Sequence, residues 1–186
     1  LQDLLDRIAP VDTELVPLRE AKGRVLAAPL FADRPSPPCD VSAMDGFCIR
    51  TSDIQIRMRI TGEVRIGHEA PSLTPGRAMR IVTGAHVPRE ADAILRVEDV
   101  QEEDGFLILD EALVRRVKPG SDIRRIGENG AAETLALRQG TYLQAAQMGV
   151  LAALGPRKVE VYRKLRVALL TTGDELVEPG EPASPW

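Results

Sequence analysis

Short apolar runs, each closed by glycine or proline, fill the middle of the chain. Over residues 54–61, apolar and polar side chains alternate, which is the pattern of a strand with one buried face. Comparable runs follow at 77–82, 93–97 and 106–109. Strands this short, separated by turn residues, are typical of a small β sandwich or barrel. We therefore expect residues 39–131 to form one small β-rich domain.

The segments on either side predict a second, mixed unit. Residues 144–154 read as a helix that ends at Gly155, and residues 158–162 read as a strand. We expect residues 13–38 and 132–163 to combine into a split, elongated α/β linker domain, in which the β-rich domain is inserted.

A continuous apolar run at residues 166–170 differs from the alternating strands. Such runs are typical of parallel strands that are covered on both faces. A parallel strand needs neighbours and crossover connections of a dozen or more residues each, and few residues follow this one. We expect residues 164–186 to begin an α/β domain that the chain does not contain, and a short helix within residues 1–12 to dock on it. The predicted fold class is thus mixed α and β, with several domains.

The composition of the chain excludes several functional classes of protein. The formal net charge is −4 and aromatic residues make up only 3%, which argues against a nucleic-acid binder. No apolar run approaches the roughly 18 residues of a membrane span, and no signal-peptide pattern opens the chain. Cys39 and Cys48 form no C-x-x-C pair, so a structural zinc site is not expected. We expect a cytoplasmic protein without nucleic acid or membrane among its partners.

Asp45 is the first candidate functional residue. The proline-rich residues 34–38 make the approach stiff and extended, because proline fixes φ and restricts the residue before it. Asp45 and Gly46 then form a turn pair ahead of a strand-like run that starts at Phe47. The chain thus presents one carboxylate at a sharp corner. An ordinary turn without a catalytic role is the competing interpretation.

Thr83 and Gly84 form the second candidate site, where the run at 77–82 gives way to a loop. Backbone N–H groups of such a loop, together with a threonine hydroxyl, suit an anion. The alternative is a strand end at which the hydroxyl of Thr83 bonds to its own backbone.

A cationic loop over residues 118–130 is the third candidate. Arg124 and Arg125 lie within it, and Arg115 and Arg116 precede it. Arginine binds phosphate in a forked geometry, so this cluster on an acidic protein suits a phosphorylated ligand. A solvated surface face is the alternative.

The fourth candidate is the loop after the apolar run at 166–170, which contains Thr172, Gly173, Asp174 and Glu175. Ligands of α/β proteins bind at the carboxyl ends of parallel strands, where Glu175 would offer a carboxylate oxygen to Mg²⁺. The alternative is an acidic pair that caps the start of a helix.

These four stretches resemble, in order, the motifs of the MoeA family, the molybdopterin molybdenumtransferases, whose eukaryotic relatives include the E domain of gephyrin. The first motif is S-A-M-D-G-[YF] at residues 42–47, and the second is R-I-[MF]-T-G-A at residues 80–85. The third, V-K-P-G-x-[ND]-[IV]-R-x-x-G-E-D, starts at Val117, and the fourth, T-G-[DN]-E-[LI], starts at Thr172.

The resemblance implies an enzyme that inserts molybdate into adenylylated molybdopterin and releases AMP, with Mg²⁺ or another divalent cation. It implies an elongated homodimer, whose site lies between the small β domain of one subunit and the pterin-binding α/β domain of the other. It also suggests the molybdopterin adenylyltransferase as a partner. Because residues 164–186 would be only the start of the pterin-binding domain, we expect the chain alone to lack transferase activity.

The resemblance also assigns roles to residues. The catalytic residues that it implies are Asp45, Thr83, Asn129 and Glu175, of which Asp45 and Glu175 are also the expected metal ligands. The expected substrate-binding residues are Ser42, Met44, Gly84, Arg124, Arg125, Thr172, Gly173 and Asp174.

Two positions depart from the family pattern. Val41 stands where the family usually has Asn, and Asn129 stands where it has Asp. Asn keeps a carbonyl oxygen for a metal ion but carries no charge, so we expect weaker metal binding at position 129. The competing hypothesis is a MoeA-like protein that kept the fold as a binding or scaffold protein and lost turnover.

Overall fold

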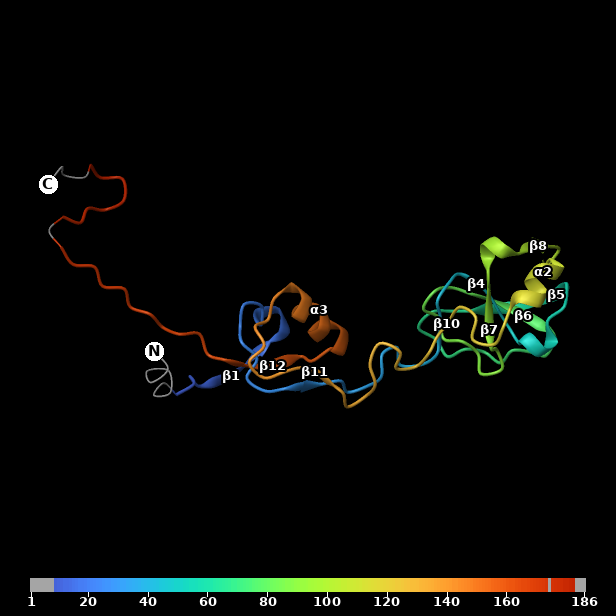
Figure 1. The fold of residues 1–186 in the computed structure, drawn as a ribbon, viewed down its shortest axis with the longest axis horizontal. Coiled ribbons are helices and arrows are strands. Elements are labelled where there is room, and N and C mark those ends of the chain that lie inside the picture. Colours follow the sequence, from blue (N-terminus) through green and yellow to red (C-terminus); the bar gives the residue numbers. More distant parts are fainter. Residues whose placement is uncertain (1–8, 174, 183–186) are drawn as a thin grey trace. The chain divides into compact units, whose positions relative to one another are not determined.

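The computed structural model describes residues 9–173 and 175–182, so the helix expected near the N-terminus falls on residues 1–8, outside the described part. The chain divides into two compact units. One combines residues 1–28 with residues 138–186, and the other spans residues 29–137 (Figure 1). Strands predominate in the described residues, and the helices are few and short. The predicted limits of the β-rich domain, 39–131, stay a prediction.

A six-stranded sheet organises the unit of residues 29–137, with the strand order β7-β4-β6-β5-β9-β8. Strands β5 and β6 run parallel, and the other neighbours run antiparallel. The strands are β4 (Gly46–Ile49), β5 (Arg57–Val64), β6 (Arg77–Ile81), β7 (Ala93–Arg96), β8 (Gln101–Glu103) and β9 (Phe106–Ile108).

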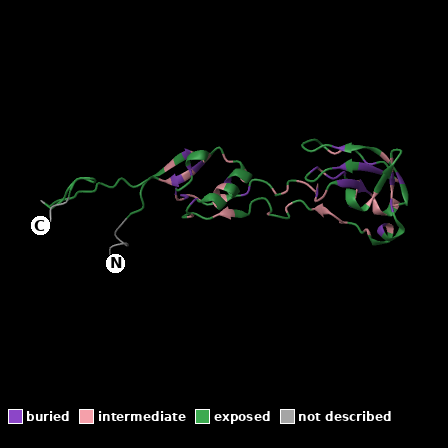
Figure 2. Cartoon of the chain, turned by 90° about the horizontal axis from the view of Figure 1, so that it is seen from above, coloured by how far each residue is buried: buried purple, intermediate pink, exposed green. Residues whose placement is uncertain are grey.

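Both faces of this sheet are buried at β4. Phe47 and Ile49 belong to one core cluster, whereas Cys48 between them belongs to a second cluster. Successive side chains of a strand point to opposite faces, so the two clusters lie on opposite sides of the sheet. Helix α2 (Glu111–Arg116) adds Leu113 to the first cluster. Figure 2 shows that buried residues gather on the strands of this sheet.

Two short ladders and two 3-10 turns complete this unit. Strand β3 (Val41–Ser42) pairs with β10 (Ile123–Arg124), and β2 (Leu30–Phe31) pairs with β11 (Leu135–Leu137). The 3-10 turns are η2 (Thr51–Asp53) and η3 (Val97–Asp99). The β3–β10 ladder brings the proline-flanked arm and the cationic loop together, although they are far apart in the sequence.

The other unit is built on the antiparallel pair of β1 (Thr13–Pro17) and β12 (Lys158–Tyr162). It also contains the 3-10 turn η1 (Leu18–Glu20) and helix α3 (Ala145–Leu154), which ends at Gly155 with φ +75°. Arg24 is buried there, forms an ion pair with Glu14 and donates to the Tyr162 carbonyl at 2.7 Å. The helices of the described residues are too short to span a membrane.

One expectation about a single element was wrong in its bounds. The strand expected over 54–61 begins at Arg57, because the chain stays irregular from the end of η2 at Asp53 up to Ile56, which is 50% exposed. The residues at 166–170 form no strand, and Leu169 and Leu170 are both 88% exposed. A parallel strand cannot form without neighbours, and no described strand pairs with this segment. The expectation that the segment begins an α/β domain stays a prediction.

The sequence interpretation did not include helix α2, because it considered Arg115 and Arg116 only as charges that precede the cationic loop. The signal for this helix was present in Asp110, whose Oδ1 accepts a hydrogen bond from the Leu113 N–H at 2.6 Å. Aspartate is a preferred N-cap, because its oxygen satisfies an N–H group that has no partner within the helix.

We predict that Gly46→Ala destabilises the protein by about 3 kcal/mol, because β4 approaches β7 too closely for a side chain. A Cβ atom at position 46 would lie 1.9 Å from the Leu95 carbonyl oxygen, a backbone atom that cannot turn aside. Gly130→Ala is the matched control, since the nearest atom there is the Thr134 Oγ1 at 4.0 Å. Urea unfolding measures both variants, and equal stabilities would contradict the prediction.

Candidate functional site

Asp45 lies at the corner between β3 and β4, and its backbone is held by the residue that follows β7. The Val97 N–H donates to the Asp45 carbonyl at 3.0 Å, which continues the β4–β7 pairing by one residue. Gly46 permits this approach because it has no side chain. The Asp45 side chain itself is exposed. The turn therefore presents the carboxylate to solvent from a fixed backbone.

Thr83 binds the Asp45 carboxylate twice. Its N–H and its hydroxyl both donate to Asp45 Oδ1, each at 2.7 Å. These bonds favour the charged form and hold the pKa of Asp45 below its ordinary value. The bond from the Thr83 amide has the larger effect, and the bond from the Thr83 hydroxyl has the smaller one. Among the bonds made by the described residues, none uses Asp45 Oδ2. Asp45 therefore stands ionised, oriented through one oxygen and open at the other.

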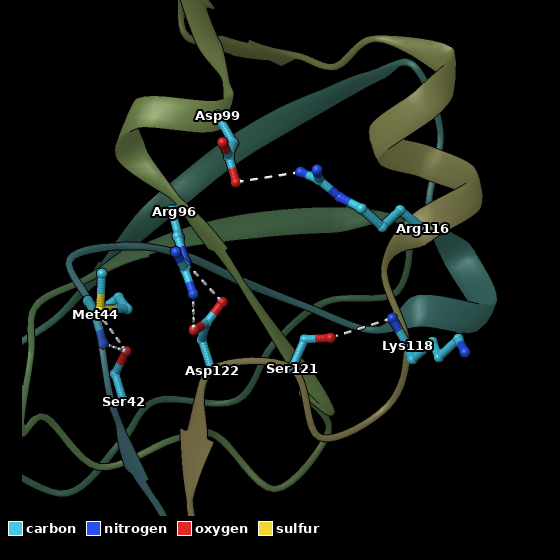
Figure 3. Close-up of polar contacts among 8 residues, drawn as sticks. All are labelled: Ser42, Met44, Arg96, Asp99, Arg116, Lys118, Ser121 and Asp122. Carbon is cyan, nitrogen blue, oxygen red and sulfur yellow. Dashed lines mark hydrogen bonds and ion pairs between the residues drawn. The ribbon is translucent and has the colours of Figure 1, made fainter.

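Ser42 supports this turn from inside. It is only 1% exposed, and its Oγ donates to the Met44 carbonyl at 2.6 Å (Figure 3). Its backbone is also held, because the Ser42 N–H donates to Ala85 O and the Gly84 N–H donates to Ser42 O. The expected substrate-binding residues Ser42, Met44 and Gly84 thus lie together beside Asp45. A buried Ser42 shapes the turn rather than facing a ligand.

The cationic loop contains Asn129, Arg124 and Arg125, and its arginines are engaged within the protein. Arg124 Nη2 donates to Asn129 Oδ1 at 2.6 Å, and the Asn129 N–H donates to Ser36 O at 2.8 Å. Arg125 Nη1 donates to Asp40 Oδ2 at 2.6 Å. Hydrogen bonds therefore hold the loop in one conformation. Its guanidinium groups are half-exposed and bonded to other side chains of the protein.

Asp40 is the anchor of this loop on the arm before β3. The Ile126 N–H donates to its Oδ1 at 2.8 Å, beside the bond from Arg125. Partial burial raises the pKa of Asp40, but the bonds from Ile126 and Arg125 outweigh that effect and hold the pKa below its ordinary value. Asp40 thus stays ionised and fastens the loop.

The remaining expected site residues belong to the other unit. Thr172, Gly173 and Glu175 lie in irregular, exposed chain, and Asp174 is outside the described residues. In the described part of the chain, no group of three His, Cys, Asp or Glu side chains is arranged to hold a metal ion. Asp45 fits Mg²⁺ as a single ligand, because that ion takes one or two protein carboxylates and completes its shell with water and phosphate oxygens.

Asp40, Arg96 and Asp122 are important to the site's geometry and were not singled out from the sequence. Arg96 forms a two-bond ion pair with Asp122 (Figure 3). Asp122 follows a Pro-Gly-Ser stretch, a signal for a turn that tolerates aspartate with positive φ, and its φ is +53°. No sequence signal pointed to the pairing of Arg96 with Asp122, since they lie on separate segments.

Together, fold and site define a small β-rich module that displays an anchored carboxylate beside a tied, arginine-rich loop. The family described as the MoeA N-terminal region (domain I and II) matches residues 1–155. The chain belongs to this family.

Relatives with curated names agree with the family. The chain is 38% identical to a molybdopterin molybdenumtransferase of Haemophilus influenzae, over 93% of this chain and 43% of that protein. It is 35% identical to the protein of the same name from Nostoc sp., over 94% of this chain and 41% of that protein. The chain thus spans about two fifths of the length of these relatives.

Solved structures show the same fold. A crystal structure of the molybdopterin biosynthesis MoeA protein from Pyrococcus horikoshii matches with a TM-score of 0.80 at 30% sequence identity. The match covers 100% of this chain and 48% of that one. A second MoeA structure from Pyrococcus horikoshii OT3 gives a TM-score of 0.78 at 37% identity, over 87% of this chain and 44% of that one.

We predict that Thr83→Val raises the pKa of Asp45 part of the way to its ordinary value, because the hydroxyl bond is lost while the amide bond remains. Since the folded pKa is depressed, this bond's contribution to stability is present above the ordinary pKa and is lost as pH falls through the depressed one. Carboxyl NMR titration measures the shift.

The control is Thr61→Val, whose hydroxyl donates to the Ala78 carbonyl on β6 instead. This substitution should leave the pKa of Asp45 in place. An unchanged pKa in Thr83→Val would show that the hydroxyl does not hold the carboxylate in solution.

Proposed function

We propose that this chain supplies one side of the active site of a molybdopterin molybdenumtransferase, an enzyme of molybdenum cofactor biosynthesis. The reaction inserts molybdate into adenylylated molybdopterin and releases AMP. The observation that carries the proposal is the exposed Asp45 carboxylate, fixed by two bonds from Thr83. The curated names of the relatives support the same reaction class.

Asp45 would hold a divalent cation, Mg²⁺ or a similar ion, through its open Oδ2. When bound, this cation neutralises the charge that develops as the phosphoanhydride of the substrate breaks. Thr83 keeps the carboxylate ionised and oriented. Oδ1 of Asp45 would thus orient the side chain, and Oδ2 would bind the cation.

Arg124 and Arg125 would face the phosphate groups of the substrate, together with Gly84 and Met44 near the turn. Both arginines are partly exposed, so an anion can reach them while Asn129 and Asp40 hold them in place. We propose that Glu175, Thr172, Gly173 and Asp174 complete the site from the partner subunit of a cytoplasmic homodimer. The chain alone would then lack turnover, and the molybdopterin adenylyltransferase would supply the substrate.

A non-catalytic binding or scaffold protein is the second candidate function. The observation that favours it is Asn129, which lacks the family's charge and whose Oδ1 is occupied by Arg124. Such a protein would bind the adenylylated pterin without releasing AMP.

AMP release from adenylylated molybdopterin by the full-length protein decides between these functions. We expect release that requires both molybdate and Mg²⁺, with the reaction lacking molybdate as the control. Substrate binding without molybdate-dependent release would favour the scaffold function instead.

We further predict that Asn129→Asp lowers the Mg²⁺ concentration needed for half-maximal release in the full-length protein. The substitution restores a negative charge at nearly constant shape, and a carboxylate is a better Mg²⁺ ligand than an amide oxygen. The Arg124 bond to this position limits the gain, so we expect a change of only a few-fold. An unchanged Mg²⁺ requirement and rate would remove position 129 from the metal site.

A further inference from the structure

The outer edge of β7 forms a ladder with the loop of residues 120–122. The Gly120 N–H donates to Asp92 O at 2.6 Å, and the Ile94 N–H donates to Ser121 O at 2.9 Å. These bonds use alternate residues, because only every second residue of an antiparallel strand turns its backbone groups away from the neighbour. The next residue in this series is Arg96, which bonds to the loop through its side chain and not through its backbone.

Arg96 makes the third connection through its guanidinium group. Its Nε donates to Asp122 Oδ2 at 3.0 Å and its Nη2 donates to Oδ1 at 2.8 Å, as Figure 3 shows. This forked geometry fixes orientation as well as distance. Only 22% of the Asp122 side chain is exposed, so solvent screens the pair less than it screens a fully exposed one.

Asp122 is also the residue at which the loop leaves β7. Its φ of +53° turns the chain away, and its carbonyl then accepts the Ala43 N–H at 2.8 Å. On the other side of the pair, Val97 follows Arg96 and donates its N–H to the Asp45 carbonyl at 3.0 Å. The ion pair thus links two segments that each hold the Asp45 turn by a main-chain bond. The Asp122 carbonyl binds the Ala43 N–H, and the Val97 N–H after Arg96 binds the Asp45 carbonyl.

A cleft of about 340 Å³ lies beside the pair, lined in part by Arg96, Asp99, Arg116 and Asp122. The charged side chains of this cleft are paired with one another, since Arg116 lies 3.5 Å from Asp99 and Arg96 binds Asp122. An entering anion would have to compete with these carboxylates. The arrangement therefore favours a role for the pair in holding the turn over a role in ligand binding.

We propose that the Arg96–Asp122 ion pair positions Asp45 for the transferase reaction, by fixing the loop that holds Ala43 and the strand end that holds the Asp45 carbonyl. Both are positioning residues, because they act through the backbone while Thr83 binds the carboxylate. The kinetic consequence rests on the proposed function. The effect on the geometry of the turn is independent of it.

Two variants of the full-length protein test the pair. Arg96→Ala removes the guanidinium, and Asp122→Asn removes the charge while keeping a residue that tolerates positive φ. The control is Arg65→Ala, which removes an ion pair of 2.7 Å with Glu63 that has no link to the turn. Amide hydrogen exchange and kinetics are measured on all three.

We expect Arg96→Ala to speed exchange of the Ala43, Thr83 and Val97 amides about tenfold, while the core amide of Leu107 stays unchanged, because the opening is local. Asp122→Asn should lie between Arg96→Ala and the wild type, and Arg65→Ala should match the wild type. A merely structural pair would instead raise exchange throughout the sheet. Uniform or unchanged exchange would overturn the proposal.

We expect kcat for AMP release to fall about tenfold in Arg96→Ala, with KM nearly unchanged, because a small displacement of a reacting group lowers turnover steeply. Local opening without a fall in kcat would overturn the positioning role. A wild-type protein without transferase activity would contradict the proposed function, and the exchange rates would still decide whether the pair holds the turn.

Discussion

The burial of β4 on both faces is the constraint on which the unit of residues 29–137 depends. Phe47 and Ile49 face one core and Cys48 faces the other, so this strand has no freedom to slip by one residue. Its start is fixed as well, because Gly46 lies against the Leu95 backbone. The residue just before this start is Asp45. The core therefore sets the position of the candidate catalytic carboxylate, and Thr83 from the end of β6 sets its orientation.

The hydrogen-bond partners of the charged side chains around this turn determine which of the charges are neutralised. Asp45 is held ionised by neutral donors of Thr83, which leaves its negative charge uncompensated. Arg124 donates to the amide oxygen of Asn129 and also forms an ion pair with Glu128, in which Nε and Oε1 are 3.5 Å apart. Arg125 is paired with the carboxylate of Asp40. In the proposed function, Asp45 would offer its unpaired negative charge to a cation, and the half-exposed guanidinium of Arg124 would have to exchange its contact with Glu128 for a phosphate oxygen.

The sequence predicted those features that depend on local pattern. The β-rich middle followed from alternation and turn residues, and the pairing of short strands confirms the strands at 77–82 and 93–97 to within one residue. The family motifs led to Asp45 and Thr83, which the structure brings into contact. Residues 166–170 form no strand, and the expectation that they begin an α/β domain stays a prediction, because a parallel strand depends on neighbours outside its own segment. The Arg96–Asp122 pair escaped notice because it joins two segments through side chains, and no periodicity encodes that contact.

In the proposed function, Asp45 belongs to the reacting centre and is not merely an exposed turn residue. The most direct test compares Asp45→Asn with Asp104→Asn in the full-length protein, since each replaces an exposed aspartate that precedes a glycine in a turn. We expect Asp45→Asn to lower the rate of molybdate-dependent AMP release by on the order of 100-fold, the size of loss found when one electrostatic contact to a reacting group is removed. The loss of stability should be small, because the amide oxygen can still accept the bonds from Thr83. We expect Asp104→Asn to keep the wild-type rate. Equal rates in both variants would contradict a role of Asp45 in the reaction.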